Sequence, residues 1–160
     1  MDLVKIFKNT FLVILACLAL SACATQKKVD TGQMQGDVYT GTDTVKYLAS
    51  GVPDRVFFAT NESVLTTRSR DTLRKQAAWM RKNSDLTFVI EGHADERGTR
   101  EYNLALGERR ANAAKDYLMT YGVDGNRLSV ISYGKERPVD SGSNPLSLSK
   151  NRRSVTVKAN

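Results

Sequence analysis

No apolar run in this chain is long enough to cross a membrane. The run Phe11–Leu20 has ten uninterrupted apolar residues, whereas a membrane-spanning helix needs about 20. Lys5 and Lys8 precede this run, and a short apolar segment behind basic residues is typical of a secretory signal peptide. We therefore predict that the protein is exported and that residues 1–22 are a cleaved signal peptide.

Cysteine is scarce, since Cys17 and Cys23 are the only two. Cys17 lies in the apolar run and would be lost with it, which excludes an intrachain disulfide. Residues 20–23 read Leu-Ser-Ala-Cys, which resembles a bacterial lipobox cut directly before its cysteine. The resemblance implies that Cys23 is the lipidated N-terminus, carrying fatty acyl chains such as palmitate. The alternative is ordinary signal-peptidase cleavage nearby, which leaves Cys23 as a free thiol or removes it.

Histidine occurs once, at His93. Glu91, Asp95 and Glu96 lie near it in the sequence, which raises the possibility of a metal site or a general acid and base. One imidazole with carboxylates is a weak zinc set, however, and no serine or cysteine nucleophile has a second histidine to activate it. We therefore predict a protein that is not an enzyme and has no cofactor or metal, with His93 as a hydrogen-bonded turn residue.

The chain is basic, with a formal net charge of +7 at pH 7. This balance favours anionic partners, which include nucleic acid, acidic lipid headgroups and anionic wall polymers. Export argues against nucleic acid. The basic residues are interleaved with acidic ones along both expected helices, which indicates solvated faces rather than one continuous basic patch.

Residues 24–42 are polar, glycine-punctuated and without periodicity. We predict that residues 23–42 form a lipidated N-terminus and a flexible tether, and that residues 43–160 form one domain. The patterns there predict a short helix at Asp43–Ser50, a strand at Arg55–Phe58, a helix capped by Thr66 or Thr67 with Leu73, Ala77 and Met80 inward, a strand from Leu86, a helix from Thr99 to about Tyr121, a strand at Arg127–Tyr133, a helical turn at Leu146–Arg152 and a last strand with Val155 and Val157. This order predicts an α+β fold, a two-layer sandwich of helices on a small sheet.

The most informative stretch runs from Leu86 to Ala111. Alternating apolar residues stop at Gly92, and a polar loop containing Asp95 follows before Thr99, a helix N-cap. We therefore expect a polar site at the sheet edge.

In the following helix, Arg110 interrupts an apolar stripe formed by Leu106, Ala113, Tyr117 and Tyr121. Spacing alone leaves two interpretations of Arg110. Its guanidinium reaches water while its stem packs, or it is aimed at an anionic ligand beside the Asp95 loop.

Several motifs together resemble the OmpA-like peptidoglycan-binding domain. They are VFF near residue 57, VIEGHADERGTREYNLALGERRANA at residues 89–113, YGKERP at residues 133–138 and NRR at residues 151–153. The resemblance implies a βαβαβ(α)β domain in which Asp95 and Arg110 hold the meso-diaminopimelate side chain of the wall stem peptide. It also implies that the same pocket is lined by Thr99, Tyr102, Asn103 and Leu106.

The chemistry of diaminopimelate is consistent with these two residues. Its side chain ends in an ammonium and a carboxylate, so its recognition needs one fixed negative charge and one planar positive fork. Asp95 and Arg110 supply that pair. Backbone N–H groups at the start of the Thr99 helix offer a further anion site.

A lipobox, a tether and one such domain resemble the outer-membrane lipoproteins of this family. The resemblance implies an anchor in the outer membrane, a domain facing the periplasm, the partners TolB and TolA, and a part in cell division. Ala24 is not the aspartate that signals retention at the inner membrane in such lipoproteins. The alternative is an envelope adaptor lipoprotein outside the Tol system.

One position departs from the family pattern. Many relatives have aspartate after the first strand's phenylalanine, where this chain has Ala59 after Phe58. A polar contact with the ligand is then missing or is supplied by Asn61. Arg152 and Arg153 are also open to two interpretations, either as partner contacts or as braces for the fold.

Overall fold

The structure, a computed structural model, describes residues 34–159. The expected signal peptide, Cys23 and the first part of the expected tether lie outside these residues. The elements in chain order are β1 (Met34–Gln35), β2 (Val38–Tyr39), β3 (Tyr47–Ala49), β4 (Val52–Pro53), β5 (Arg55–Phe57), α2 (Thr67–Lys82), β6 (Phe88–His93), α3 (Arg100–Thr120), the 3-10 helix η1 (Gly125–Arg127), β7 (Leu128–Gly134), α4 (Pro145–Asn151) and β8 (Arg153–Lys158). No helix within residues 34–159 is long and apolar enough to cross a membrane.

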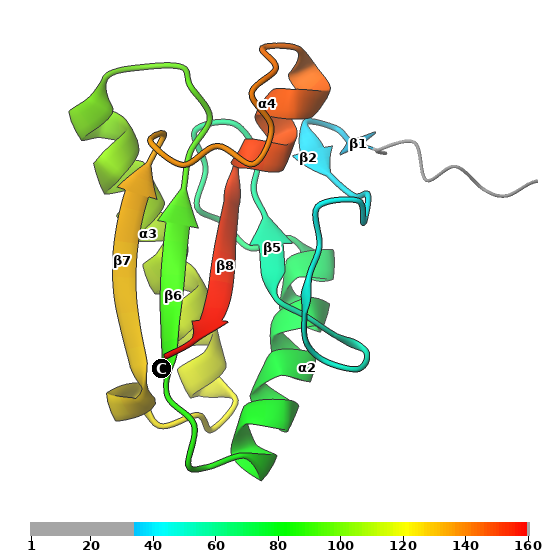
Figure 1. Cartoon of the computed structure of the whole chain (residues 1–160), viewed down its shortest axis with the longest axis vertical. Coiled ribbons are helices and arrows are strands. Elements are labelled where there is room, and N and C mark those ends of the chain that lie inside the picture. The colour runs from blue at the N-terminus through cyan, green and yellow to red at the C-terminus, as the bar shows by residue number, and fades with distance from the viewer. Residues whose placement is uncertain (1–33, 160) are drawn as a thin grey trace, which may run out of the picture.

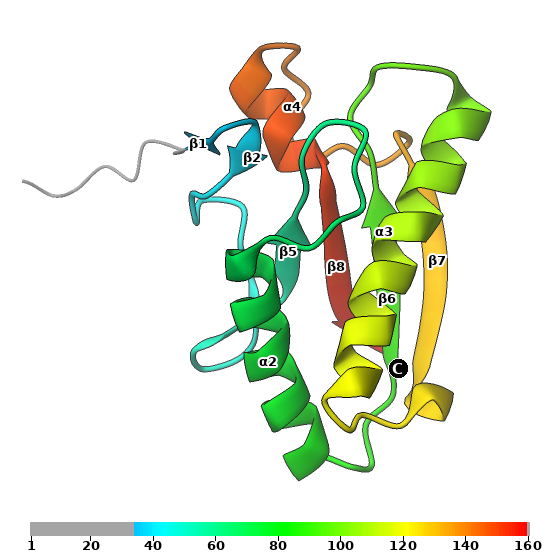
Figure 2. The ribbon, with the colours of Figure 1, turned by 180° about the vertical axis from the view of Figure 1, so that it is seen from behind.

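Four strands form the central sheet, in the order β5-β8-β6-β7. β6 and β7 are parallel, whereas β8 runs antiparallel to both β5 and β6. Helices α2 and α3 cover one face of the sheet, and the other face points toward the viewer in Figure 1. Figure 2 shows the two helices from their own side. The predicted α+β fold, with helices layered on a small sheet, is confirmed.

The core lies between the sheet and the two helices. Phe88 and Ile90 project from β6 into this layer and are buried, as their alternation predicts. The helix caps are also as expected. The side chain of Thr66 accepts a hydrogen bond from the Ser69 N–H, and that of Thr99 accepts one from the Tyr102 N–H.

The inward face of α3 is shifted by about one residue from the predicted stripe. Ala111, Ala114 and Leu118 are buried in the core, whereas Ala113 and Tyr117 are only half-buried. The predicted stripe was centred toward the aromatic residues Tyr117 and Tyr121. In the structure the small side chains of Ala111 and Ala114 face the core instead, which allows α3 to lie close to the sheet.

β6 and α3 approach each other most closely at Gly92 and Gly107. A Cβ atom added to Gly92 would lie 1.8 Å from the carbonyl oxygen of Gly107. The backbones therefore touch where no side chain fits, and this contact fixes the height of α3 above the strand. Arg110 follows Gly107 by almost one turn, so the same contact sets its position.

Two predictions near the N-terminus are wrong. Asp43–Ser50 is not a helix, because residues 47–53 form the β3–β4 hairpin, with Gly51 at φ +72° in its turn. Residues 34–42 do not behave as a tether, because β1 and β2 pair and Tyr39 is only 1% exposed, with its ring 4.8 Å from that of Phe57. A fragment that begins at Asp43 would therefore lack part of the core.

Candidate functional site

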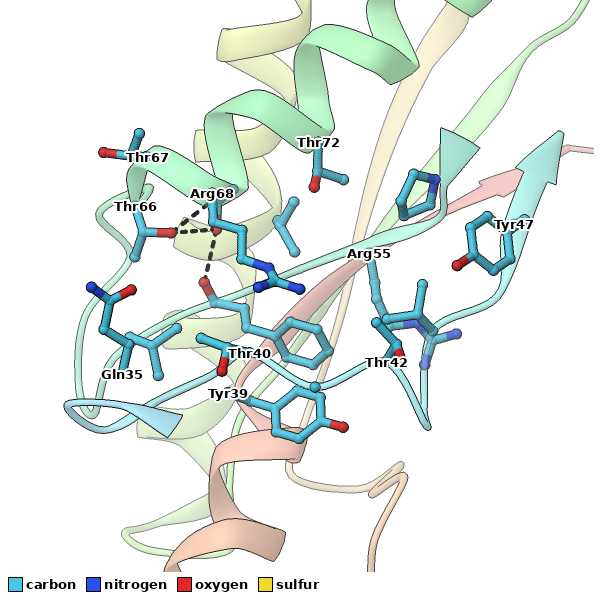
Figure 3. Close-up of a pocket in the computed structure, with 17 residues that line it drawn as sticks. Gln35, Tyr39, Thr40, Thr42, Tyr47, Arg55, Thr66, Thr67, Arg68 and Thr72 are labelled. Carbon is cyan, nitrogen blue, oxygen red and sulfur yellow. Dashed lines mark hydrogen bonds between the residues drawn. The ribbon is translucent and has the colours of Figure 1, made fainter. Parts of the chain in front are cut away.

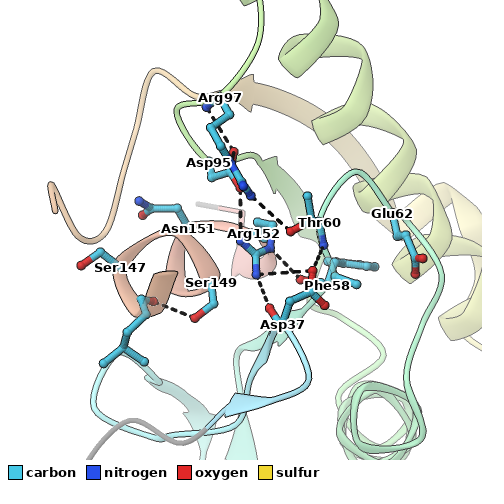
Figure 4. A network of polar contacts seen from close by, with 12 residues as sticks. Asp37, Phe58, Thr60, Glu62, Asp95, Arg97, Ser147, Ser149, Asn151 and Arg152 are labelled. Atoms are coloured by element: carbon cyan, nitrogen blue, oxygen red, sulfur yellow. Dashed lines mark hydrogen bonds and ion pairs between the residues drawn. The ribbon is translucent and has the colours of Figure 1, made fainter. Parts of the chain in front are cut away.

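Four segments meet beside the end of β6 that leads to α3. They are the loop after β5, the loop after β6, the end of α4 and the turn between β1 and β2. Figure 4 shows that their polar side chains form one network, with Arg152 at its centre between Asp95 and Asp37. Segments that are far apart in the sequence are thus held together at the site that the Asp95 loop predicted.

Asp95 is buried and bears a negative charge. Its carboxylate accepts hydrogen bonds from Arg97 Nη2 at 2.8 Å and from Arg152 Nη1 at 3.2 Å, and it also accepts one from the Arg97 N–H at 3.1 Å. Burial raises the pKa of Asp95, but the hydrogen bonds from the two arginines outweigh burial and hold the pKa below its ordinary value. The Arg97 side chain is 52% exposed, so one of these partners lies at the surface.

Arg110 is fully buried. Its guanidinium donates to three backbone carbonyls, from Nε to Glu62 at 2.8 Å, from Nη1 to His93 at 2.8 Å and from Nη2 to Ala59 at 2.9 Å. The interpretation in which Arg110 reaches bulk water is therefore wrong, because the guanidinium is as buried as its stem.

Burial lowers the pKa of Arg110 to about 10, with a further contribution from Arg152, while Asp95 acts in the opposite direction. The side chain therefore stays charged at neutral pH. It ties the loop after β5 to the carbonyl that lies two residues before Asp95.

The other predicted residues lie around the start of α3, in two layers. Asn103 and Leu106 are buried, and the Asn103 amide donates to the Arg97 carbonyl at 2.8 Å, so it holds the Asp95 loop from beneath. Thr99 and Tyr102 are exposed beside the same loop. The structure thus brings the predicted set together, with two members at the surface and two that support the loop.

Sequence reasoning missed the N-terminal contribution to this site. The Asp37 carboxylate accepts a hydrogen bond from the Thr60 N–H at 2.6 Å and lies 3.9 Å from Arg152. An acid from the β1–β2 turn therefore lies against the loop that carries Ala59 in place of the family's aspartate. No periodicity or motif marks Asp37, so the sequence held no signal for it.

Arg152 and Arg153 brace the fold. Arg152 is 2% exposed and donates to the carbonyl oxygens of Phe58 and Asp37 as well as to Asp95. Arg153 donates to the carbonyls of Asn151 and Arg137. The structural interpretation therefore applies to Arg152, and Arg153 also braces the fold through these two bonds. The NRR motif near the C-terminus was the only signal for Arg152.

His93 ends β6 instead of lying in the turn. Its ring is 1% exposed, and its Nε2 lies 3.4 Å from the Glu91 carboxylate. Burial and the charges of Arg153, Arg55 and Arg137 lower the pKa of His93 to about 3, so the ring is neutral. Among residues 34–159, no group of three or more histidine, cysteine and acidic residues is placed to hold a metal ion.

Two hollows lie away from the Asp95 loop. A cavity of about 420 Å³ lies between residues 35–47, β5 and the first turn of α2, with Tyr39, Arg55 and Arg68 in its lining (Figure 3). A more open groove of about 830 Å³ lies over the uncovered face of the sheet. Neither is lined by Asp95 or Arg110, so the predicted site is separate from both.

Comparisons with known proteins agree with this arrangement. The OmpA family matches residues 57–152. A peptidoglycan-associated lipoprotein of Rhizobium meliloti (strain 1021) is 44% identical over 156 residues, which cover 95% of this chain and 89% of that protein. One from Haemophilus influenzae (strain ATCC 51907 / DSM 11121 / KW20 / Rd) is 35% identical over 152 residues, which cover 93% of this chain and 96% of that protein.

A solved structure shows the same fold. The crystal structure of the peptidoglycan-associated lipoprotein from Burkholderia pseudomallei superposes with a TM-score of 0.65 at 34% identity, covering 66% of this chain and 90% of that chain. The resemblance drawn from the motifs is thereby confirmed. This chain belongs to the OmpA family and, within it, to the peptidoglycan-associated lipoproteins.

Proposed function

We propose that the protein binds peptidoglycan non-covalently and that Asp95 and Arg110 hold the diaminopimelate side chain of the stem peptide. Its relatives are peptidoglycan-associated lipoproteins, which supports peptidoglycan as the ligand. The observation that carries the assignment to this site is the juxtaposition of the two charges. The Arg110 guanidinium is bonded to the carbonyl of His93, and the ionised Asp95 carboxylate follows two residues later.

The two charges suit the two ends of a zwitterion. Asp95 receives the ammonium of the ligand. The Nη1 and Nη2 atoms of Arg110 each carry a second N–H besides the one that bonds a carbonyl. Because Arg110 is fully buried, the proposal requires the loop after β5 to move when the ligand binds, so that these N–H groups can donate to the ligand carboxylate. Thr99 and Tyr102 form the exposed wall beside them. The role is binding and not catalysis, because this set contains no nucleophile with its base.

Arg97 acts as a movable partner in this proposal. Its half-exposed side chain occupies Asp95 when no ligand is present. The ammonium of the ligand can replace it, because Asp95 then exchanges one positively charged partner for another. Arg152, which is buried, keeps its own bond to Asp95 and preserves the geometry of the loop.

The wall-binding domain is one end of a tether in our proposal. Lipidated Cys23 holds the chain in the outer membrane, with the domain facing the periplasm, and residues 24–33 lead from the anchor to the domain. Anchoring raises the effective concentration of the domain at the wall, so modest affinity is sufficient. We further propose that TolB and TolA of the Tol-Pal system are partners and that the protein acts in envelope integrity and cell division.

Sedimentation with diaminopimelate-type peptidoglycan tests the proposal. Residues 24–160 are expected to pellet with the wall, and Asp95→Asn is expected to weaken binding about tenfold or more, because a charged hydrogen bond contributes about 1.5–3 kcal/mol. Asp116→Asn, an exposed change on α3, is the matched control and should leave binding unchanged.

The two variants must first give the circular dichroism spectrum of the parent. If folded Asp95→Asn pellets as well as the parent, the site assignment is wrong. If the parent itself stays in the supernatant, the protein is an envelope adaptor that docks on proteins.

A further inference from the structure

The sheet face that α2 and α3 leave uncovered carries a groove with features of its own. The groove has a volume of about 830 Å³ and lies on the side that faces the viewer in Figure 1. Its floor is formed by β6 and β8, including His93, Arg153 and Val155. The β3–β4 hairpin and the loop after β7 form its sides.

Three buried polar atoms in the groove lining have no partner among the described residues. They are Oγ1 of Thr44, Nδ1 of His93 and Nε of Arg153. His93 and Arg153 are 1% and 6% exposed. A buried N–H without an acceptor costs about 1–3 kcal/mol, so such a group is normally satisfied by a protein group, an ordered water or a bound ligand. Arg153 Nε–H is a donor, which calls for an acceptor oxygen.

The groove lining has more positive than negative charge. Five basic residues line it, namely Lys46, Arg55, Arg137, Arg153 and Lys158, against the three acidic residues Asp43, Asp54 and Glu91. Two of the acids are already paired, Asp54 with Arg55 at 2.7 Å and Asp43 with Lys150 at 2.8 Å. The remaining imbalance favours a ligand that carries negative charge.

The groove also offers apolar surface to such a ligand. Tyr47, Val139 and Val157 line the groove together and are 58%, 39% and 38% exposed, respectively. Inorganic anions would leave this surface uncovered. An extended peptide can place carboxylates and apolar side chains on alternate positions, and its carboxylates match the basic residues along the groove.

We propose that this groove binds an extended peptide segment of a protein partner, with one carboxylate on Arg153 and with apolar side chains on Tyr47, Val139 and Val157. Arg137 and Lys46, which are exposed and line the groove, attract further acidic groups at the rim. Arg137 lies with its guanidinium 3.7 Å from the centre of the Tyr133 ring, which holds the charge at the edge of the groove. This surface is separate from the proposed wall-binding site, although the two share His93, whose carbonyl oxygen accepts from Arg110.

Because His93 is the only histidine of the chain and lines the groove, NMR can detect binding in the groove through the signals of this one side chain. The imidazole C–H signals of residues 24–160 in a carbon-correlated NMR spectrum come from His93 alone. The probe is an acetylated, amidated hexapeptide of alternating leucine and glutamate. We expect a saturable shift of the His93 signals, with a Kd on the order of 1 mM.

The control peptide replaces every glutamate with glutamine and should give no saturable shift. The double variant Lys46→Gln/Arg137→Gln should weaken the binding of the glutamate peptide about tenfold, because it removes two exposed charges from the rim. Arg70→Gln, an exposed change on α2, should not affect it.

Equal binding of the two peptides would overturn the proposal, as would an unshifted His93 signal or full affinity in the double variant. Sedimentation of the double variant with peptidoglycan should equal that of the parent, so failure of this proposal is distinguishable from failure of the wall-binding proposal.

Discussion

Arg110→Ala is expected to lower the free energy of unfolding by about 3–5 kcal/mol. The substitution removes three charged hydrogen bonds and leaves the carbonyl groups of Ala59, Glu62 and His93 without this donor. It also leaves a hollow beside Phe58, whose ring lies 5.4 Å from the guanidinium carbon. Removing the buried guanidinium also removes the free energy that its desolvation costs. The expected loss of stability is therefore smaller than the sum of three charged hydrogen bonds. Urea denaturation measures the effect.

The adjacent arginine provides the control for this change. Arg109 lies on the same helix but is exposed, so Arg109→Ala should change stability by less than about 0.5 kcal/mol. If the two alanine variants unfold at the same urea concentration, Arg110 does not clamp the loops. Loss of wall binding in an Arg110 variant would have two explanations, which is why the binding test uses Asp95→Asn.

Gly92→Ala should lower the free energy of unfolding by a similar amount, about 3 kcal/mol. The new Cβ would overlap the Gly107 carbonyl oxygen at 1.8 Å, and both partners are backbone atoms that cannot rotate away. α3 must therefore move away from the sheet. This movement would carry Arg110 off its three carbonyls, so peptidoglycan binding should fall together with stability. Thermal unfolding and sedimentation measure the two effects.

Gly125, whose close neighbour is a flexible side chain and not backbone, distinguishes this clash from a general effect of alanine. A Cβ added to Gly125 would meet only the flexible end of the Met119 side chain, at 2.9 Å. Gly125→Ala should therefore change stability by less than about 1 kcal/mol. A Gly92→Ala protein as stable as the Gly125→Ala protein would show that the close approach of β6 and α3 is not required.

The central elements were predictable because strong local patterns agreed with the final packing. Alternation in β6 reflects a strand with one face in the core, and Thr66 and Thr99 occupy real N-caps. The family motifs located the Asp95 loop and Arg110 together. Their mutual position could be predicted because the strand, loop and helix that carry them are consecutive in the chain.

The N-terminal segment was not predictable in the same way. β1 and β2 have two residues each, which is too short for any periodicity. They are held by tertiary contacts, chiefly the burial of Tyr39 and the bonds from Arg152 and Thr60 to Asp37. The two bonds join residues that are 23 and 115 positions apart, so no local pattern reveals them. The same limit explains why Asn61 and not Asp37 was expected beside Ala59.

Arg110 shows how far a spacing argument extends. Helical periodicity placed it on the inward face, which is correct, but it could not distinguish a carbonyl clamp from a group that contacts a ligand. The structure adds the three carbonyl bonds, and the two remaining N–H groups of Nη1 and Nη2 are compatible with a ligand carboxylate. Both roles can belong to one side chain once ligand binding uncovers the guanidinium, which is fully buried in this structure.

The most direct measurement compares two stem tripeptides that differ only in their last residue. One ends in meso-diaminopimelate and the other in lysine, which has the ammonium but lacks the terminal carboxylate. The experiment is an NMR titration of an isotopically labelled fragment that contains residues 24–160. Addition of the diaminopimelate peptide should shift the backbone amide signals of residues 95–102 in a saturable way. The lysine peptide should bind about tenfold more weakly or worse, because it offers nothing to Arg110. Equal affinities, or shifts confined to another part of the domain, would contradict the proposal that Asp95 and Arg110 together hold this ligand.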